Sequence, residues 1–65
     1  MTAREIEILQ LFSRGLSYRE AAKSLGISPH TIGDHVKSTY RKLNVHSCTE
    51  AIFEARQLGL IPSRG

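Results

Sequence analysis

Apolar residues recur at helical spacing in four stretches of this sequence, and no stretch alternates apolar and polar residues as a half-buried strand does. Each stretch begins at a hydroxyl residue. Three starts, at residues 2–5, 17–20 and 47–50, read Ser/Thr-x-x-Glu, in which hydroxyl and carboxylate satisfy each other's free backbone amides. The fourth is Ser28 followed by Pro29, whose missing N–H costs nothing at the first helical position. The pattern therefore predicts an all-α, four-helix domain.

The predicted helix ends fall at residues that accept a left-handed backbone, namely Gly15, Gly26, Asn44 and Gly59. The third predicted helix covers about residues 29–43 and the fourth about residues 48–58. A short second helix, a tight turn at residues 25–27 and a longer third helix follow one another directly. This succession is typical of a helix-turn-helix unit.

Helical periodicity separates buried from exposed positions. Ile32, Val36 and Leu43 share one stripe of the third helix and are predicted to lie in the core, next to the small residues Ala21 and Ala22. The opposite face carries a polar row, His30, Gly33, Asp34, Lys37, Ser38 and Arg41. On the fourth helix the predicted buried face is Ala51, Ala55 and Leu58, and Phe53 falls well away from it.

Basic residues gather in the middle of the chain, where residues 14–46 hold six Lys or Arg and only two Asp or Glu. A solvated helix face shows the same pattern, but a helix in the major groove can place Lys37 on guanine and Asp34 on the amine of cytosine. Asp34 is equally well explained as a charge left in solvent. The predicted phosphate contacts from basic side chains are Arg19, Lys23, Arg41 and Lys42.

Composition excludes several other classes of protein. The 65 residues suffice for one domain, and a single cysteine excludes an internal disulfide. We expect no metal site, no cofactor and no enzymatic activity, because neither zinc-ligand spacing nor a nucleophile with its base is present. We also expect no small-molecule ligand. No apolar run approaches the roughly 20 residues of a membrane span, so a cytoplasmic location is expected.

The sequence resembles the DNA-binding domain of the LuxR/NarL/FixJ family of bacterial transcription regulators. The matching motifs are Thr2-x-Arg4-Glu5, Gly15-Leu16-Ser17, Glu20-Ala21-Ala22, Leu25-Gly26-Ile27-Ser28, Thr31-Ile32, His35-Val36, Lys42-Leu43, Glu50-Ala51 and Gly59-Leu60-Ile61. The resemblance implies a helix-turn-helix domain that spans residues 1–65 and belongs to the winged-helix superclass, although it has no wing. Such a domain often forms the C-terminal part of a longer response regulator. It also implies DNA binding through the third helix and dimerisation through the fourth.

Carried over position by position, the resemblance places Gly33, Asp34 and Lys37 at base edges and adds Thr31 and Tyr40 to the phosphate contacts. Gly33 departs from the family, which usually has a long polar residue there, and so does Cys48, where arginine is common. The expected dimer contact is Phe53, with Arg56 and Gln57 at its rim.

These observations predict sequence-specific binding of double-stranded DNA by a homodimer that regulates transcription in the bacterial cytoplasm. The competing hypothesis is a protein interaction module, in which the third helix docks on RNA polymerase or a sigma factor and DNA binding is secondary.

Overall fold

Four helices make up the computed structural model, which describes residues 1–62. They are α1 (Ala3–Ser13), α2 (Tyr18–Leu25), α3 (Pro29–Leu43) and α4 (Cys48–Gln57), and no strand occurs in the described part of the chain. The predicted all-α class and the predicted order of elements are confirmed.

Local hydrogen bonds fix where each helix begins. Thr2 and Glu5 form a reciprocal capping box at α1, and Ser17 with Glu20 form a second at α2. In the third predicted capping box, at Ser47 and Glu50, only one of the two expected hydrogen bonds forms. The hydroxyl of Ser47 accepts from the amide of Glu50, but the Glu50 carboxylate accepts from the amide of His46, one residue earlier than a box requires.

The turn between α2 and α3 has the predicted form. Gly26 adopts a left-handed backbone with φ of 70°, and the amide of Ile27 donates to the carbonyl of Ala22 at 3.0 Å. Ser28 then caps α3. This turn holds α2 and α3 in the fixed relation of a helix-turn-helix unit.

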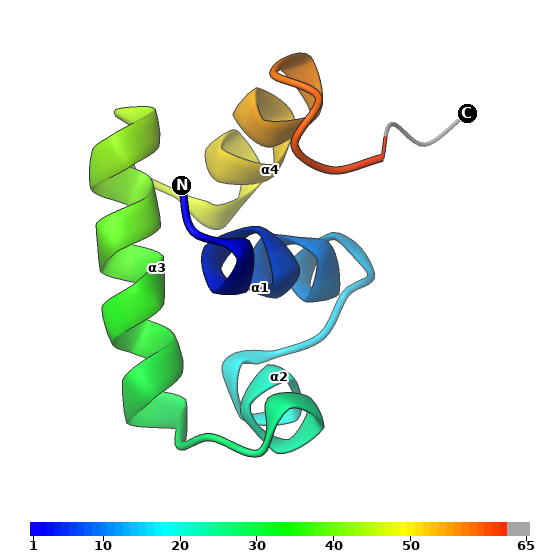
Figure 1. The fold of residues 1–65 in the computed structure, drawn as a ribbon, viewed down its shortest axis with the longest axis vertical. Helices are drawn as coiled ribbons and strands as arrows, with labels where there is room; N and C mark the ends of the chain where they lie inside the picture. The colour runs from blue at the N-terminus through cyan, green and yellow to red at the C-terminus, as the bar shows by residue number, and fades with distance from the viewer. Residues whose placement is uncertain (63–65) are drawn as a thin grey trace.

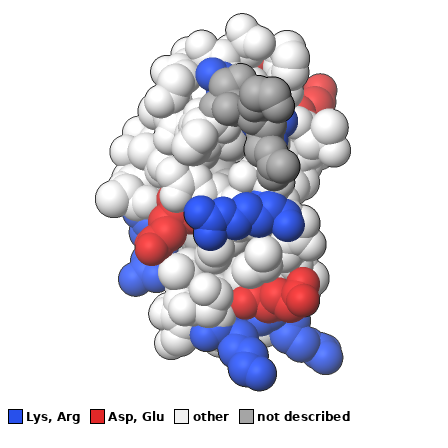
Figure 2. Space-filling view, turned by 90° about the vertical axis from the view of Figure 1, so that its right-hand side faces the viewer, with Lys and Arg blue, Asp and Glu red and all other residues white. Residues whose placement is uncertain are grey.

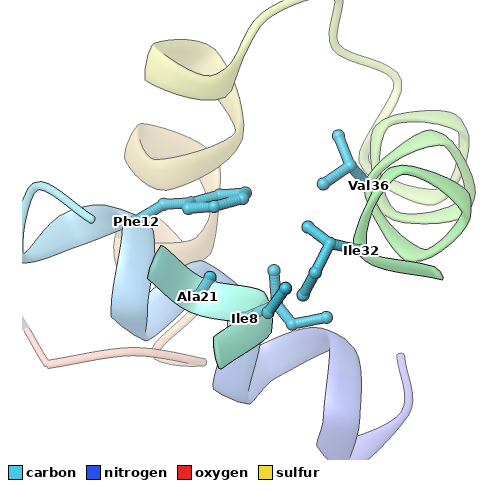
Figure 3. Close-up of a cluster of buried hydrophobic side chains, with 6 residues drawn as sticks. Ile8, Phe12, Ala21, Ile32 and Val36 are labelled. Atoms are coloured by element: carbon cyan, nitrogen blue, oxygen red, sulfur yellow. The ribbon is translucent and has the colours of Figure 1, made fainter. Parts of the chain in front are cut away.

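The helix α1 lies at the centre and contacts the three others, with α4 above it, α2 below it and α3 along one side (Figure 1). The first core cluster joins α1, α2 and α3. Its buried side chains, shown in Figure 3, include Ile8, Phe12, Ala21, Ile32 and Val36, which point toward one another. One side of α3 is therefore buried, as its apolar stripe predicts.

A second cluster, built on Leu9, Ala51, Ala55 and Ile61, packs α4 and the following chain against α1. The prediction that Leu58 belongs to this face is wrong, because Leu58 is 61% exposed. The helix α4 ends at Gln57 and the chain turns at Gly59, where φ is 74°. Beyond this turn, Ile61 is buried in the second cluster at 3% exposure.

Candidate nucleic-acid interface

The outer face of α3 carries most of the predicted polar row. His30, Asp34, Lys37 and Arg41 are exposed, while Gly33 between them is half-buried. Because the opposite face of α3 packs on α1 and α2, this row points away from the domain. The four exposed side chains of this row are therefore accessible to a partner.

Gly33 occupies an ordinary helical position, without the positive φ that would require glycine. A Cβ added to Gly33 would meet nothing within 4 Å. Since glycine costs about 1 kcal/mol relative to alanine inside a helix, its presence here has no explanation in the packing of the domain. The space beside Gly33 is open to an external partner.

Asp34 lies next to His30 on the adjacent turn, and the two side chains face each other. The Nε2 atom of His30 is 3.8 Å from Oδ2 of Asp34, with the side chains 89% and 66% exposed. An i, i+4 spacing on a helix is the signal that predicts such a pair, although the sequence analysis did not use it.

Two residues of the C-terminal half of α3 turn toward α1 instead of the outer face. The ammonium of Lys42 donates to Oε1 of Glu5 at 2.9 Å. Ser38 is half-buried and lies near enough to this carboxyl to help lower its pKa. The placement of Ser38 in the outer row is therefore wrong. Lys42, predicted as a phosphate contact, pairs its ammonium with Glu5 while 43% of its side chain stays exposed, and that contact stays a prediction.

The carboxylate of Glu5 is nearly buried, with 3% of its side chain exposed. Burial alone would raise its pKa, but the hydrogen bonds from the amide of Thr2 and the ammonium of Lys42 outweigh burial and lower the pKa to about 2. Sequence analysis identified the capping role of Glu5 and missed its bond to α3, 37 positions away.

Tyr40 also lies apart from the outer row. Its ring is half-buried and packs against both core clusters, near Tyr18 and Cys48. Burial raises the pKa of the Tyr40 hydroxyl, and burial likewise raises the pKa of the Cys48 thiol. Tyr40 is thus a partly buried residue packed against the core, and its phosphate contact stays a prediction.

The remaining predicted phosphate contacts lie around the N-terminal part of the helix-turn-helix unit and along α3. Arg19 and Lys23 are both exposed on α2. Thr31 is half-buried in the first turn of α3, with its hydroxyl 3.0 Å from that of Ser28.

On the face turned away from α3, basic and acidic side chains are interspersed (Figure 2). That face is therefore not a uniformly basic surface.

The outer face of α4 carries the predicted dimer residues. Phe53 is 58% exposed and Gln57 is exposed at the end of the helix. Arg56 is half-buried, and its Nε has no hydrogen-bond partner among residues 1–62. A single exposed apolar side chain is common on protein surfaces, so the dimer contact at Phe53 stays a prediction.

Residues 1–62 contain no group of three or more His, Cys, Asp or Glu side chains placed to hold a metal ion. Over the same residues, every helix is too short or too polar to cross a membrane.

Residues 1–55 match the family model described as bacterial regulatory proteins, luxR family. The chain is 40% identical over 63 residues to the transcriptional activator protein CarR of Pectobacterium carotovorum, covering 97% of this chain and 26% of CarR. It is 36% identical over 62 residues to the HTH-type transcriptional activator RamA of Corynebacterium glutamicum, covering 95% of this chain and 22% of RamA. The chain thus spans about a quarter of the length of these relatives.

Two solved structures share the fold. The transcription factor GerE superposes with a TM-score of 0.92 at 37% identity, over 95% of this chain and 92% of GerE. The response regulator ChrA of a heme-sensing two-component system gives a TM-score of 0.90 at 50% identity, over 92% of this chain and 30% of ChrA. The resemblance stated from the sequence motifs is confirmed.

Proposed function

The chain belongs to the luxR family of bacterial regulatory proteins, and we propose that it binds double-stranded DNA sequence-specifically through α3 and regulates transcription. The observation that carries this proposal is the outer face of α3, which is exposed, polar and opened by the missing side chain of Gly33. A major groove about 12 Å wide admits a helix presented in this way.

In this proposal, Lys37 donates to the O6 and N7 atoms of a guanine, and Asp34 accepts from the N4 amine of a cytosine. Asp34 has a short side chain, so its carboxylate reaches a base edge only when the backbone of α3 lies close to the groove floor. The open space at Gly33 permits that approach. These three residues are the proposed base-reading set.

The proposed phosphate contacts are Arg19 and Lys23 from α2, and Thr31 and Arg41 from α3. Such contacts fix the position of the protein on the duplex and carry no sequence information directly. We leave Lys42 and Tyr40 out of this set. The ammonium of Lys42 is bonded to Glu5, and the ring of Tyr40 packs against the core.

We propose that two copies bind paired half-sites and meet through α4, with Phe53 at the centre and Arg56 and Gln57 beside it. The exposure of Phe53 supports this mode. A single helix face buries too little area for tight association in solution, so the dimer should form mainly on DNA.

The curated relatives CarR and RamA are about four times longer than this chain. We therefore propose that residues 1–65 act as one DNA-binding unit whose activity a sensing or receiver domain controls in a longer regulator. Its place of action would be the bacterial cytoplasm, and RNA polymerase is the proposed partner in activation.

Selection of binding sites from a pool of random duplexes tests the central proposal. We expect recovery of a defined sequence, with paired half-sites, that binds the purified domain without any other protein. Recovery of no preferred sequence, together with binding to RNA polymerase or a sigma factor, would favour the protein interaction module instead.

A further inference from the structure

The outer face of α3 presents a hydrogen-bond donor close beside an acceptor. His30 is the second residue of α3, and Asp34 lies one turn further along. An imidazole nitrogen that faces a carboxylate carries the hydrogen, because a lone pair there would be repelled. The Nε2 atom of His30 is nevertheless 3.8 Å from Oδ2 of Asp34, which is too long for a hydrogen bond. With the side chains 89% and 66% exposed, both groups remain available to a partner.

The major-groove edge of a C·G base pair has the complementary pattern. The N4 amine of cytosine is a donor, and the O6 atom of the paired guanine is an acceptor. These two atoms form one of the hydrogen bonds of the base pair, so they lie only about 2.9 Å apart. Asp34 can therefore accept from the amine while His30 donates to O6. Small rotations of two exposed side chains cover the difference in spacing.

The order of donor and acceptor gives this pattern a direction. A G·C or T·A pair in the same place would set an acceptor against Asp34 and a donor against His30. An A·T pair keeps the favourable order, but the thymine methyl group occupies the side on which guanine offers its N7 acceptor. A C·G pair is thus the best partner, an A·T pair is second, and the two reversed pairs are the worst.

The place of the two residues within α3 favours base edges over phosphates. In helix-turn-helix proteins the N-terminal residues of the second helix contact base edges, and His30 and Asp34 lie in the N-terminal half of α3. A phosphate would repel the carboxylate of Asp34. The backbone between them leaves room for a base, since a Cβ added to Gly33 would meet nothing within 4 Å.

We propose that His30 and Asp34 together read a single C·G pair, with Asp34 on the cytosine and His30 on the guanine of the same pair. This inference rests on the proposed DNA binding through α3, and it adds His30 and the identity and orientation of one base pair. Lys37 follows Asp34 by three residues, or about 4.5 Å along the helix axis. Successive base pairs are about 3.4 Å apart, so the guanine proposed for Lys37 belongs to a neighbouring pair.

Modified duplexes test the pairing with the parent protein. In the site selected from random duplexes, we expect one C·G pair whose replacement by G·C lowers the affinity about tenfold or more, and whose replacement by A·T lowers it less. Deoxyuridine in place of that thymine removes the methyl group and should recover part of the loss. Deoxyinosine in place of the guanine changes only the minor-groove edge, so it is the matched control and should bind as the parent site does.

Variants of the two residues test whether they act on the same base pair. His30→Ala and Asp34→Ala should each reduce the discrimination between C·G and G·C at this pair and at no other. Their effects should be non-additive in the double variant. His30→Gln keeps a donor and should retain more discrimination than His30→Ala. His46→Ala is the control, because His46 is exposed but lies outside α3, and its discrimination should equal that of the parent.

Relaxed base choice at two different pairs in the two alanine variants would overturn the inference. An equal loss on all duplexes from His30→Ala would also overturn it and make His30 a phosphate contact. A defined site without the expected order of base preferences would refute this pairing alone and leave the proposed DNA binding intact. Failure of the parent to select any sequence would instead refute the proposed function, and the pairing with it.

Discussion

The ammonium of Lys42 lies 2.9 Å from the carboxylate of Glu5, joining the last turn of α3 to the first turn of α1. The Oε1 atom that accepts from Lys42 also accepts from the amide of Thr2 in the capping box. A single carboxylate oxygen therefore fixes the start of one helix and the position of another. The bond therefore helps to hold against α1 the helix that carries the proposed base-reading residues.

Replacement of Lys42 by alanine should lower the free energy of unfolding by about 1–3 kcal/mol, because it leaves a nearly buried carboxylate without its cation. Urea denaturation measures the change. Lys42→Arg, which keeps the positive charge, is the control and should retain more of the stability. An unchanged unfolding free energy in Lys42→Ala would show that the bond contributes nothing.

Stability should fall in acid through Glu5. The pKa of this carboxyl is about 2 in the folded protein and 4.5 ordinarily, so the folded state favours the ionised form. The resulting stabilisation is present above pH 4.5 and is lost as the pH falls from 4.5 toward 2. Thermal unfolding between these pH values should show this slope reduced in Glu5→Gln and retained in Glu7→Gln. Equal slopes in the two variants would assign the acid sensitivity elsewhere.

Two substitutions at Gly33 separate its possible roles. Gly33→Ala should stabilise the domain by about 0.5–1 kcal/mol, because alanine is the better helix former and the added Cβ meets nothing within 4 Å. If close approach to DNA is the reason for glycine, affinity for the preferred site should fall, and Gly33→Lys should be worse despite its added charge. Titration of a fluorescent duplex measures both variants. Tighter and equally selective binding by Gly33→Lys would refute this role.

Lys37 and Arg41 should differ in what their loss does to recognition. Lys37→Ala should cost about 1–3 kcal/mol on the preferred site and relax the choice of base at one position, because a bidentate guanine contact is removed. Arg41→Ala should weaken binding to all duplexes alike. Competition with single-base variants of the selected site distinguishes the two patterns. Sequence-blind losses from both variants would make Lys37 a phosphate contact.

Binding should weaken steeply with salt, because neutralising phosphates releases condensed counterions. A dimer with about 6–10 phosphate contacts should lose about 10³–10⁵ in affinity between roughly 50 and 200 mM salt. Removing Arg19 or Lys23 should reduce the salt slope by about one per copy on DNA. A flat titration would contradict the DNA-binding proposal, since no other term in this interface depends so strongly on ionic strength.

The sequence by itself determined the helices and the helix-turn-helix unit, because their signals are local. The caps at Thr2, Ser17 and Ser28 bond to backbone amides within three residues, and the turn at Gly26 needs only its own backbone angles. Helical periodicity likewise assigned Ile32 and Val36 to the core.

Tertiary structure decided which polar residues remain available to a partner. Lys42 and Ser38 turn to Glu5 because the first turn of α1 lies against the C-terminal half of α3, a contact between positions far apart in the chain. Tyr40 lies where the two core clusters meet. Helical periodicity gives the direction in which a side chain leaves the axis of its helix. Only the packing of neighbouring helices determines what that side chain contacts.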